Sequence, residues 1–369
     1  MKVFPRKAVA ALFLAAAAGS AHAAPDDVFL LAEPTTGEFN KFRLEASYDV
    51  VNDTVDIFHL RERQGPVPDN AGNYQGGKLM AGYKFSPYWS GALTYWRRNI
   101  DYGQDTNGID SWMVALHYDP LAQPGARDRA LFRFAVWGDH AGSLTRSSPF
   151  NVRNTTLNGI EVSNANDVQA QADFMFSGQV NDRHTLTGFM GLGASRVTIG
   201  ALSTSVRQGG CNFNVGINSD NIARGTLAAP CQTGSGTVQS ASFAVPASQF
   251  GIDFNDDFNY TAGYLSTGVS WQWRYGGFRS HLGYQFQYLL RGNVDDRAKA
   301  YGFSPIKTNH TFGVELSYAV VKNVELFVRG QASLYNFVGT IPFLYNAATA
   351  GKLDRYYGYA SFGVRVLAF

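Results

Sequence analysis

The sequence has little charge, and beyond its first residues it has no long apolar run. Aspartate, glutamate, lysine and arginine make up 16% of the 369 residues, whereas ordinary soluble domains carry roughly 25%. After residue 23, no apolar stretch approaches the about 20 residues that a membrane-spanning helix needs. The composition therefore argues against ordinary soluble domains and against a bundle of membrane helices.

Motifs for metals, phosphates and nucleotides are missing from the sequence. It contains no phosphate loop, dinucleotide fingerprint or zinc motif. His184 and His281 have no partner at metal-ligand spacing, so we expect no metal and no cofactor. Asp139, His140 and Ser143 end one predicted strand, but adjacent strand residues point to opposite faces. We expect no enzyme, and keep a hydrolase at the rim that uses His140 as a third hypothesis.

The first 23 residues have the pattern of a secretory signal peptide. Three basic residues, Lys2, Arg6 and Lys7, precede an apolar run from Ala8 to Ala18, and Ala21-His22-Ala23 is a small-x-small cleavage site. The formal charge of +2 includes these three bases and no acid from the signal, so the mature chain sits near −1. The basic balance therefore belongs to the leader, and we expect no nucleic-acid partner.

Cysteine is scarce, and both cysteines, Cys211 and Cys231, lie in one predicted loop. Disulfides persist in the compartments that a secreted protein reaches. We predict a Cys211–Cys231 bridge with a structural role, because closing a loop of this length removes chain entropy worth about 3 kcal/mol. The wide spacing of the pair does not favour redox activity.

What the sequence has in abundance is alternation of apolar and polar residues. The clearest case is the stretch TNHTFGVELSYAVVKNVELFVRGQASL, from Thr308 to Leu334. A period of two indicates β-strands with one apolar and one polar face. A tight turn near Lys322 places Glu315 opposite Arg329 on the polar face, and Thr311 opposite Ser333.

The same alternation recurs along the whole mature chain, and the full sequence is rich in glycine (39 residues) and aromatics (14%). Each strand of a membrane barrel needs only about ten residues and one apolar face. We therefore predict an all-β, antiparallel transmembrane barrel with short periplasmic turns and long extracellular loops. The lead-in is 24–38, the barrel is 39–369, and the longest surface loop is 201–257. The predicted strands are twelve: 39–50, 77–85, 90–100, 109–119, 130–139, 168–180, 184–200, 258–274, 278–291, the two strands of 308–334, and 354–369.

The strand count remains open at the level of sequence. Residues 55–60 can form a further strand, which makes fourteen strands the alternative count. Centring the tight turns predicts the strand register elsewhere. These pairs are Gln179 with Thr185, Ser177 with Thr187, Gln272 with Arg279, and Ser270 with His281.

The chain thus resembles the Gram-negative outer-membrane β-barrel proteins. The resemblance is carried by the signal ending Ala21-His22-Ala23, the alternating strands, and Phe369 at the end of the strand YYGYASFGVRVLAF. It implies export by a cleaved signal peptide and residence in outer-membrane lipid and lipopolysaccharide. It also implies that the barrel-assembly machinery reads Phe369. Arg365 departs from the pattern, because counting back from Phe369 puts it on the outward face. A bulge, or a place at the membrane interface, would accommodate it.

The polar face of the strands predicts the lining of a lumen. One interpretation is a water-filled passage whose charges select solutes, and the other is a narrow barrel plugged by its own ion pairs. Basic residues outnumber acids on this face, which favours an anionic solute. The outward aromatic residues form girdles at the membrane interfaces. The predicted lining residues are Lys41, Arg43, Glu45, Lys78, Lys84, Arg133, Asp173, Arg279, His281, Gln285, Gln287, Arg291, Glu315 and Arg329.

These observations lead to a first hypothesis of passive transport of small hydrophilic solutes, anions favoured, by a monomer or homo-oligomer. The second hypothesis is a non-conducting surface protein, such as an adhesin, a receptor or an envelope scaffold. It rests on the Asn- and Ser-rich loop that carries the cysteines.

Overall fold

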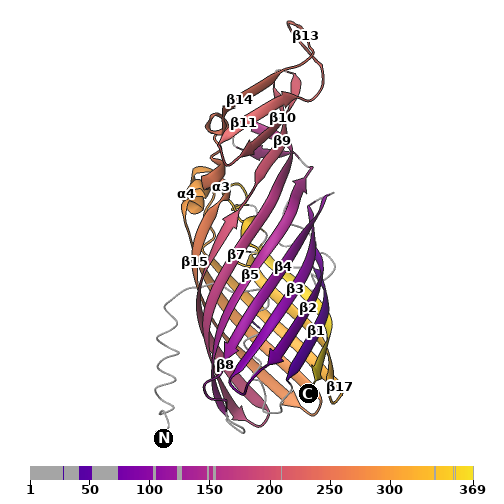
Figure 1. Ribbon diagram of the computed structural model, residues 1–369, viewed down its shortest axis with the longest axis vertical. Coiled ribbons are helices and arrows are strands. Elements are labelled where there is room, and N and C mark those ends of the chain that lie inside the picture. Colours follow the sequence, from indigo (N-terminus) through magenta and orange to yellow (C-terminus); the bar gives the residue numbers. More distant parts are fainter. Residues whose placement is uncertain are drawn as a thin grey trace.

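The computed structural model describes Val28 and residues 41–51, 74–102, 105–122, 127–147, 149–152, 155–208, 210–335, 338–351, 353 and 355–368. The predicted signal peptide, the lead-in apart from Val28, the additional strand at 55–60 and Phe369 lie outside these residues. Within the described residues, the chain forms a tall antiparallel barrel with a β-rich extension rising from one end (Figure 1).

Twelve strands make the barrel wall, each hydrogen-bonded to its two neighbours. The last strand pairs antiparallel with the first and closes the wall, so the predicted closed barrel is confirmed. In order around the wall, the strands are β1 (Phe42–Val51), β2 (Tyr74–Lys84), β3 (Trp89–Tyr102), β4 (Asp105–Tyr118), β5 (Asp128–Arg146), β7 (Thr155–Asn181), β8 (His184–Thr198), β15 (Tyr260–Tyr275), β16 (Phe278–Arg291), β17 (Thr308–Val321), β18 (Val324–Tyr335) and β19 (Arg355–Ala368).

The β17–β18 hairpin shows which face of the wall is apolar. Phe312 and Leu316 point outward and are 58% and 45% exposed, whereas Glu315 between them is only 2% exposed. An apolar outer face and a polar inner face are the reverse of a soluble barrel. They suit a wall that stands in lipid, where closure also satisfies every backbone group.

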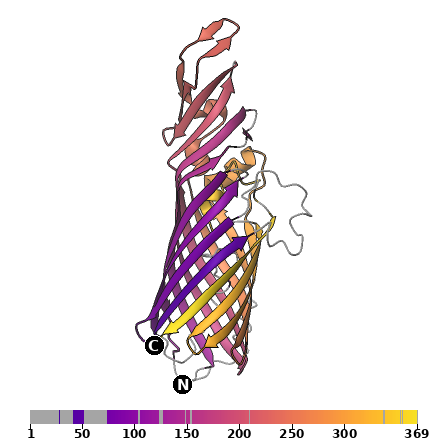
Figure 2. The same cartoon turned by 90° about the vertical axis from the view of Figure 1, so that its right-hand side faces the viewer.

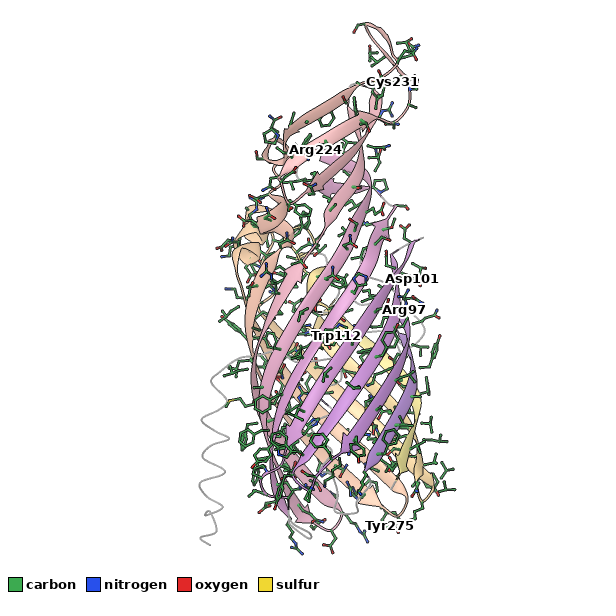
Figure 3. All side chains as sticks on the ribbon, viewed as in Figure 1. Arg97, Asp101, Trp112, Arg224, Cys231 and Tyr275 are labelled. Atoms are coloured by element: carbon green, nitrogen blue, oxygen red, sulfur yellow. A yellow bond between two sulfur atoms is a disulfide. The ribbon has the colours of Figure 1, made fainter. Side chains whose placement is uncertain are left out.

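Side chains on the outer wall mark the extent of the apolar belt. Trp112 lies on the outer face between the exposed Arg97 above and Tyr275 near the lower turns (Figure 3). Arg97 pairs with Asp110, and the guanidinium of Arg183 lies 5.0 Å from the ring centroid of Tyr275. These charges sit at the two borders of the belt, as expected for a membrane barrel. No helix among the described residues is long and apolar enough to cross a membrane.

Most predicted register pairs are confirmed, and one hairpin is wrong by two residues. Gly276 and Gly277 form a two-residue turn between the paired residues Tyr275 and Phe278. Gly276 has φ of 56°, a conformation that glycine adopts without strain. Gln272 therefore lies opposite His281 and not opposite Arg279, and Ser270 lies opposite Gly283. The confirmed pairs are Glu315 with Arg329, Thr311 with Ser333, Gln179 with Thr185, and Ser177 with Thr187.

Arg365 corrects the expectation for the last strand. Strand β19 pairs with β1 in one unbroken register, so no bulge changes the faces. Phe362 is outward and 51% exposed, whereas Arg365 is inward and 1% exposed. The apolar residues Phe362 and Val364 decide which face meets lipid. Counting back from Phe369 placed Arg365 on that outer face, and this expectation was wrong.

The predicted loop 201–257 is largely a folded extension of the barrel sheet (Figures 1 and 2). Strands β5 and β7 run beyond the mouth and pair there with further strands. The Cys211–Cys231 disulfide, with a Cα–Cα distance of 5.4 Å, ties a small hairpin to this sheet. The added strands are β6 (Phe150–Val152), β9 (Ala201–Gln208), β10 (Cys211–Asn218), β11 (Ile222–Leu227) and β14 (Ser242–Pro246), and the hairpin is β12 (Cys231–Thr233) with β13 (Gly236–Val238).

A large apolar core closes the mouth of the barrel below this extension. It gathers side chains from the upper ends of the wall strands, from the start of the extension and from four short helices. It also takes in 338–350, a segment that the sequence analysis treated as an ordinary loop. The helices are η3 (Ala247–Phe250), α3 (Phe254–Phe258), α4 (Asn293–Ala300) and η4 (Pro342–Leu344).

Candidate functional site in the barrel lumen

One side of the lumen near the periplasmic end carries charged residues that strand register brings together. Glu45 on β1 lies opposite Arg365 on β19, and Arg365 lies opposite Glu325 on β18. One strand further on, Glu315 on β17 lies opposite Arg329 on β18. Alternation turns all five side chains inward.

Arg365 joins the three carboxylates of this group. Its Nε donates to Glu45 Oε2 at 3.0 Å, Nη2 to Glu315 Oε1 at 3.2 Å and Nη1 to Glu325 Oε2 at 3.0 Å. Arg329 Nη2 donates to Glu315 at 2.6 Å and to Glu45 at 3.3 Å. Both guanidinium groups therefore make forked contacts of the kind that arginine forms best.

Three more bases complete what we call the ion cluster. Arg43 Nη2 donates to Glu45 Oε2 at 2.9 Å, Lys78 Nζ lies 3.9 Å from Glu45 Oε1, and Arg279 donates to Glu325. The cluster is then Arg43, Lys78, Arg279, Arg329, Arg365, Glu45, Glu315 and Glu325. Glu45, Glu315, Arg329 and Arg365 have side chains at most 4% exposed, so water has little access to the centre of the cluster.

The predicted amide and histidine residues of β16 lie just above the ion cluster. His281 is 2% exposed, shares a hydrogen bond with Gln272 and has Nδ1 3.8 Å from Glu315 Oε1. Gln285 donates to Ser266 Oγ at 3.1 Å, and Gln287 on the same face is also buried. These residues line the wall in a row, because inward residues on a strand recur every second position.

The remaining predicted lining residues are spread along the barrel. On the opposite wall, Arg133 Nε donates to Asp173 Oδ2 at 2.7 Å, and both side chains are buried. Lys41 is exposed at the periplasmic end and Lys84 is half-buried. Arg291 lies at the other end, beneath the mouth, where it donates to the backbone oxygen of Ile306 at 2.6 Å.

A second polar group in the upper lumen was missed by the sequence analysis. Arg98 Nη2 lies 2.5 Å from Asp139 Oδ1, contacts Ser111 as well, and stacks 4.2 Å from the ring of Trp96. These residues are at most 5% exposed. Alternation places Arg98 and Ser111 on the inner face once Tyr95 and Trp112 are known to point outward. From sequence alone this was unclear, because Tyr95 and Trp96 are adjacent aromatic residues and either could face lipid.

Aromatic side chains also fill the lumen at mid-height. Trp137 is 1% exposed and its ring lies 6.2 Å from that of Tyr264, next to Met113. Inward aromatic residues narrow a passage and offer flat surfaces to a solute. The sequence analysis placed Trp112 and Trp271 on the outer wall, where both are exposed, and assigned no face to Trp137 or Tyr264.

Val28 is the one described residue before Lys41, and it lies inside the barrel. It is 2% exposed. A Cβ added to Gly283 would lie 2.6 Å from the backbone oxygen of Val28. Gly283 is on the inward face of β16 between His281 and Gln285, so Val28 contacts the lumen wall where only glycine leaves room for it.

The mouth is covered by residues 338–350, which we call the cap. Seven of its apolar side chains are at most 5% exposed: Val338, Ile341, Phe343, Leu344, Tyr345, Ala347 and Ala350. Tyr260 Oη donates to the backbone oxygen of Pro342 at 2.7 Å, and Asn309 Nδ2 donates to that of Val338 at 3.2 Å. Wall residues therefore hold the cap by its backbone, while its side chains are buried in the apolar core.

Tyr345 is the polar anchor of the cap. Its hydroxyl donates to Asp295 Oδ1 of α4 at 3.1 Å, and the guanidinium of Arg291 lies 3.6 Å from its ring centroid. Burial raises the pKa of the Tyr345 hydroxyl to about 12, and nearby Asp295 adds to that rise. The closed cap thus favours the neutral phenol.

An ion pair between a buried aspartate and a half-buried arginine supports the cap from the side. Arg297 of α4 donates to both oxygens of Asp257, with Nη2 to Oδ2 at 3.0 Å. The hydrogen bond to Asp257 raises the pKa of Arg297. The backbone oxygen of Asp257 accepts from the amide of Ala347 at 3.0 Å. The α3–α4 pair and the cap are therefore one connected unit.

The candidate hydrolase residues are not brought together in a catalytic arrangement. Asp139 faces the lumen and contacts Arg98, whereas His140 is exposed on the other face of β5. His140 Nδ1 shares a hydrogen bond with Asn166 Oδ1 at 2.6 Å. Among the described residues, no group of three or more His, Cys, Asp or Glu side chains is placed to hold a metal.

Comparisons with solved structures find similarity to membrane barrels of several kinds. No protein-family model matches the sequence, and no curated protein sequence is significantly similar to it. The chain is similar to the translocator domain of the autotransporter NalP from Neisseria meningitidis, with 11% identity, coverage of 91% and 90% of the two chains, and a TM-score of 0.46. It is similar to the β-domain of the Bordetella autotransporter BrkA (9%, coverage 89% and 99%, TM-score 0.42). It is also similar to the KdgM porin (8%, coverage 88% and 98%, TM-score 0.36).

Proposed function

We propose that this outer-membrane β-barrel is a gated channel for small hydrophilic solutes, closed in the state described here. The observation that carries the proposal is the polar inner face, which runs from the ion cluster through His281, Gln285 and Gln287 to the Arg98–Asp139 pair. Buried ion pairs add little stability compared with apolar side chains of the same volume. Stability alone therefore does not account for a charged lumen, whereas solute passage does.

Two closures in series keep the passage shut. The cap seals the extracellular mouth with apolar side chains, and the ion cluster is the polar constriction below it. The two differ in kind. The cap is a segment separate from the wall, so it can move without breaking the barrel. The cluster consists of long side chains whose contacts can be exchanged for contacts with a solute.

The charges of the constriction favour an anion. Among the described residues, the cluster contains five basic and three acidic side chains. A carboxylate or phosphate on a solute is the natural substitute for Glu45 or Glu315 as a partner of Arg329 and Arg365. We therefore propose small organic anions as the preferred solutes.

Liposome swelling tests this function. We would compare wild type, a cap variant (Phe343→Ala/Tyr345→Ala) and a matched control in the extension (Phe213→Ala/Phe243→Ala). The account predicts slow swelling for wild type and control, and faster swelling for the cap variant in solutions of small organic anions. Equal and negligible swelling of all three folded proteins would contradict it.

A second function, a surface protein acting through its extension, is favoured by the rigid disulfide-bonded sheet above the mouth. It predicts that cells carrying the protein adhere to a partner surface, and that replacing 203–245 with a short Gly-Ser linker abolishes adhesion. Unchanged adhesion at equal surface amounts would contradict this function. None of the lumen residues named above lies in 203–245, and swelling measures conduction rather than adhesion, so the swelling assay of the cap variant separates the two functions.

A further inference from the structure

An apolar cavity of about 130 Å³ lies beside the cap, outside the polar lumen. Its walls come from the upper parts of β5, β7 and β9, from Ile199 between β8 and β9, from the α3–α4 unit and from the cap. Leu144, Ile160 and Val162 in its lining are half-buried, so the cavity reaches the surface of the extension. The apolar lining residues are Leu144, Ile160, Val162, Ile199, Leu202, Ile252, Phe258, Tyr301, Phe343, Leu344 and Ala348.

Polar groups at the cavity, including the charged side chain of Arg146, already have partners within the protein. Tyr301 donates to Asp257 Oδ2 at 2.9 Å, and Thr349 Oγ1 donates to the backbone oxygen of Leu344 at 2.8 Å. Asn346 Oδ1 accepts from the amides of Ala348 and Thr349 at 3.0 Å each. A charged ligand would lose its water without gaining a partner from these groups, and that loss is costly.

The volume sets the size of the occupant. Apolar protein cavities of about 150 Å³ stay dry and bind benzene or xenon. The present cavity has about 130 Å³, so it suits an occupant of roughly six to eight non-hydrogen atoms.

We propose that this cavity is a binding site for a small, uncharged, apolar molecule of the size of benzene. The site is distinct from the solute passage, because its walls are apolar and the lumen is lined by ions. It also makes the cap responsive to such molecules. Phe343, Leu344, Asn346, Ala348 and Thr349 belong to the cap, so an occupant that fits the closed state stabilises that state.

Fluorine NMR of fluorobenzene with the full-length protein in detergent tests the site. Wild type should bind fluorobenzene, and para-fluorobenzoate should bind at least about tenfold more weakly because its charge would be buried. Ala348→Phe should fill the cavity and weaken fluorobenzene binding at least about tenfold. Ala228→Phe, at an exposed position of the extension, is the matched control and should leave binding unchanged.

A second variant keeps the inference testable if Ala348→Phe does not fold. Leu344→Ala enlarges the cavity and should bind fluoronaphthalene more tightly than wild type does. The inference is wrong if wild type fails to bind fluorobenzene up to its solubility, or if benzoate and benzene analogues bind equally. It is also wrong if native mass spectrometry finds a lipid chain that fluorobenzene does not displace. Binding does not depend on conduction, so failure of the channel proposal would leave this result interpretable.

Discussion

Glu45 and Arg365 face each other across the seam where the first and last strands close the barrel, with Arg365 Nε 3.0 Å from Glu45 Oε2. The two residues are 320 positions apart in the chain. Their contact exists only after the wall has closed, and it joins the closing seam to the ion cluster.

Arg365→Met should therefore weaken the closed barrel. It leaves Glu45 and Glu315 buried with fewer partners, and breaking a buried pair costs about 3 kcal/mol or more. Urea unfolding in lipid vesicles measures this loss. Arg97→Met is the control, because its pair with Asp110 is exposed and such pairs contribute about 1 kcal/mol or less. The Glu45→Gln/Arg365→Met double variant should lose less than the sum of the single losses. Strictly additive losses would contradict a coupled seam.

The cap should open at alkaline pH, because Tyr345 then loses its phenol proton. Burial raises its pKa from 10.0 to about 12. The stability that the neutral phenol gives the closed cap is complete below pH 10 and is lost as pH rises towards about 12. Arg291 and Asp295 are the charged groups that face it. The conductance of wild type should rise as the pH increases from 10 towards about 12, and Tyr345→Phe should reduce that rise. Identical pH profiles of the two proteins would rule out this role.

Removing the disulfide should loosen the extension but not the barrel. In Cys211→Ser/Cys231→Ser, the loss of the loop constraint corresponds to about 3 kcal/mol in the simple entropy model. Hydrogen exchange should accelerate over β10–β14 and stay unchanged over β15–β18. Unchanged exchange throughout would show that the sheet pairing alone holds the extension.

Gly283→Val should displace Val28 from the lumen wall, because its Cβ would meet the backbone oxygen of Val28 at 2.6 Å. Val28→Cys provides the readout, since both native cysteines are in the disulfide. A maleimide should label Val28→Cys poorly alone and well when Gly283→Val is added. Gly263→Val, with open space around its Cβ, is the control and should not increase labelling. Equal labelling in all three backgrounds would contradict the contact.

Sequence alone predicted the wall of the barrel well, because alternation is a local signal that each strand carries by itself. The paired residues Glu315 and Arg329 could be found from one hairpin and its turn. The β15–β16 hairpin shows the limit. Moving the turn centre by one residue, which Gly276 and Gly277 permit, changes every partner by two positions.

The parts of the site that depend on long-range contacts could not be predicted. Phe343 and Tyr345 stand in a segment without periodicity, and they are buried only because α4 and the wall surround them. Arg365 joins the cluster through strands β1 and β17, far away in sequence. The extension was missed because β5 and β7 continue past the lipid, where neither face has to be apolar.

Single-channel recording of the Phe343→Ala/Tyr345→Ala cap variant in planar bilayers, with wild type beside it, tests the central claim most directly. The account predicts rare or no openings of wild type at neutral pH, and anion-selective openings of the cap variant. Adding Arg329→Gln should reduce that anion preference. A cap variant that is folded and silent would contradict a gated passage. If the cap variant opens but Arg329→Gln leaves its anion preference unchanged, the ion cluster is not the constriction of the passage.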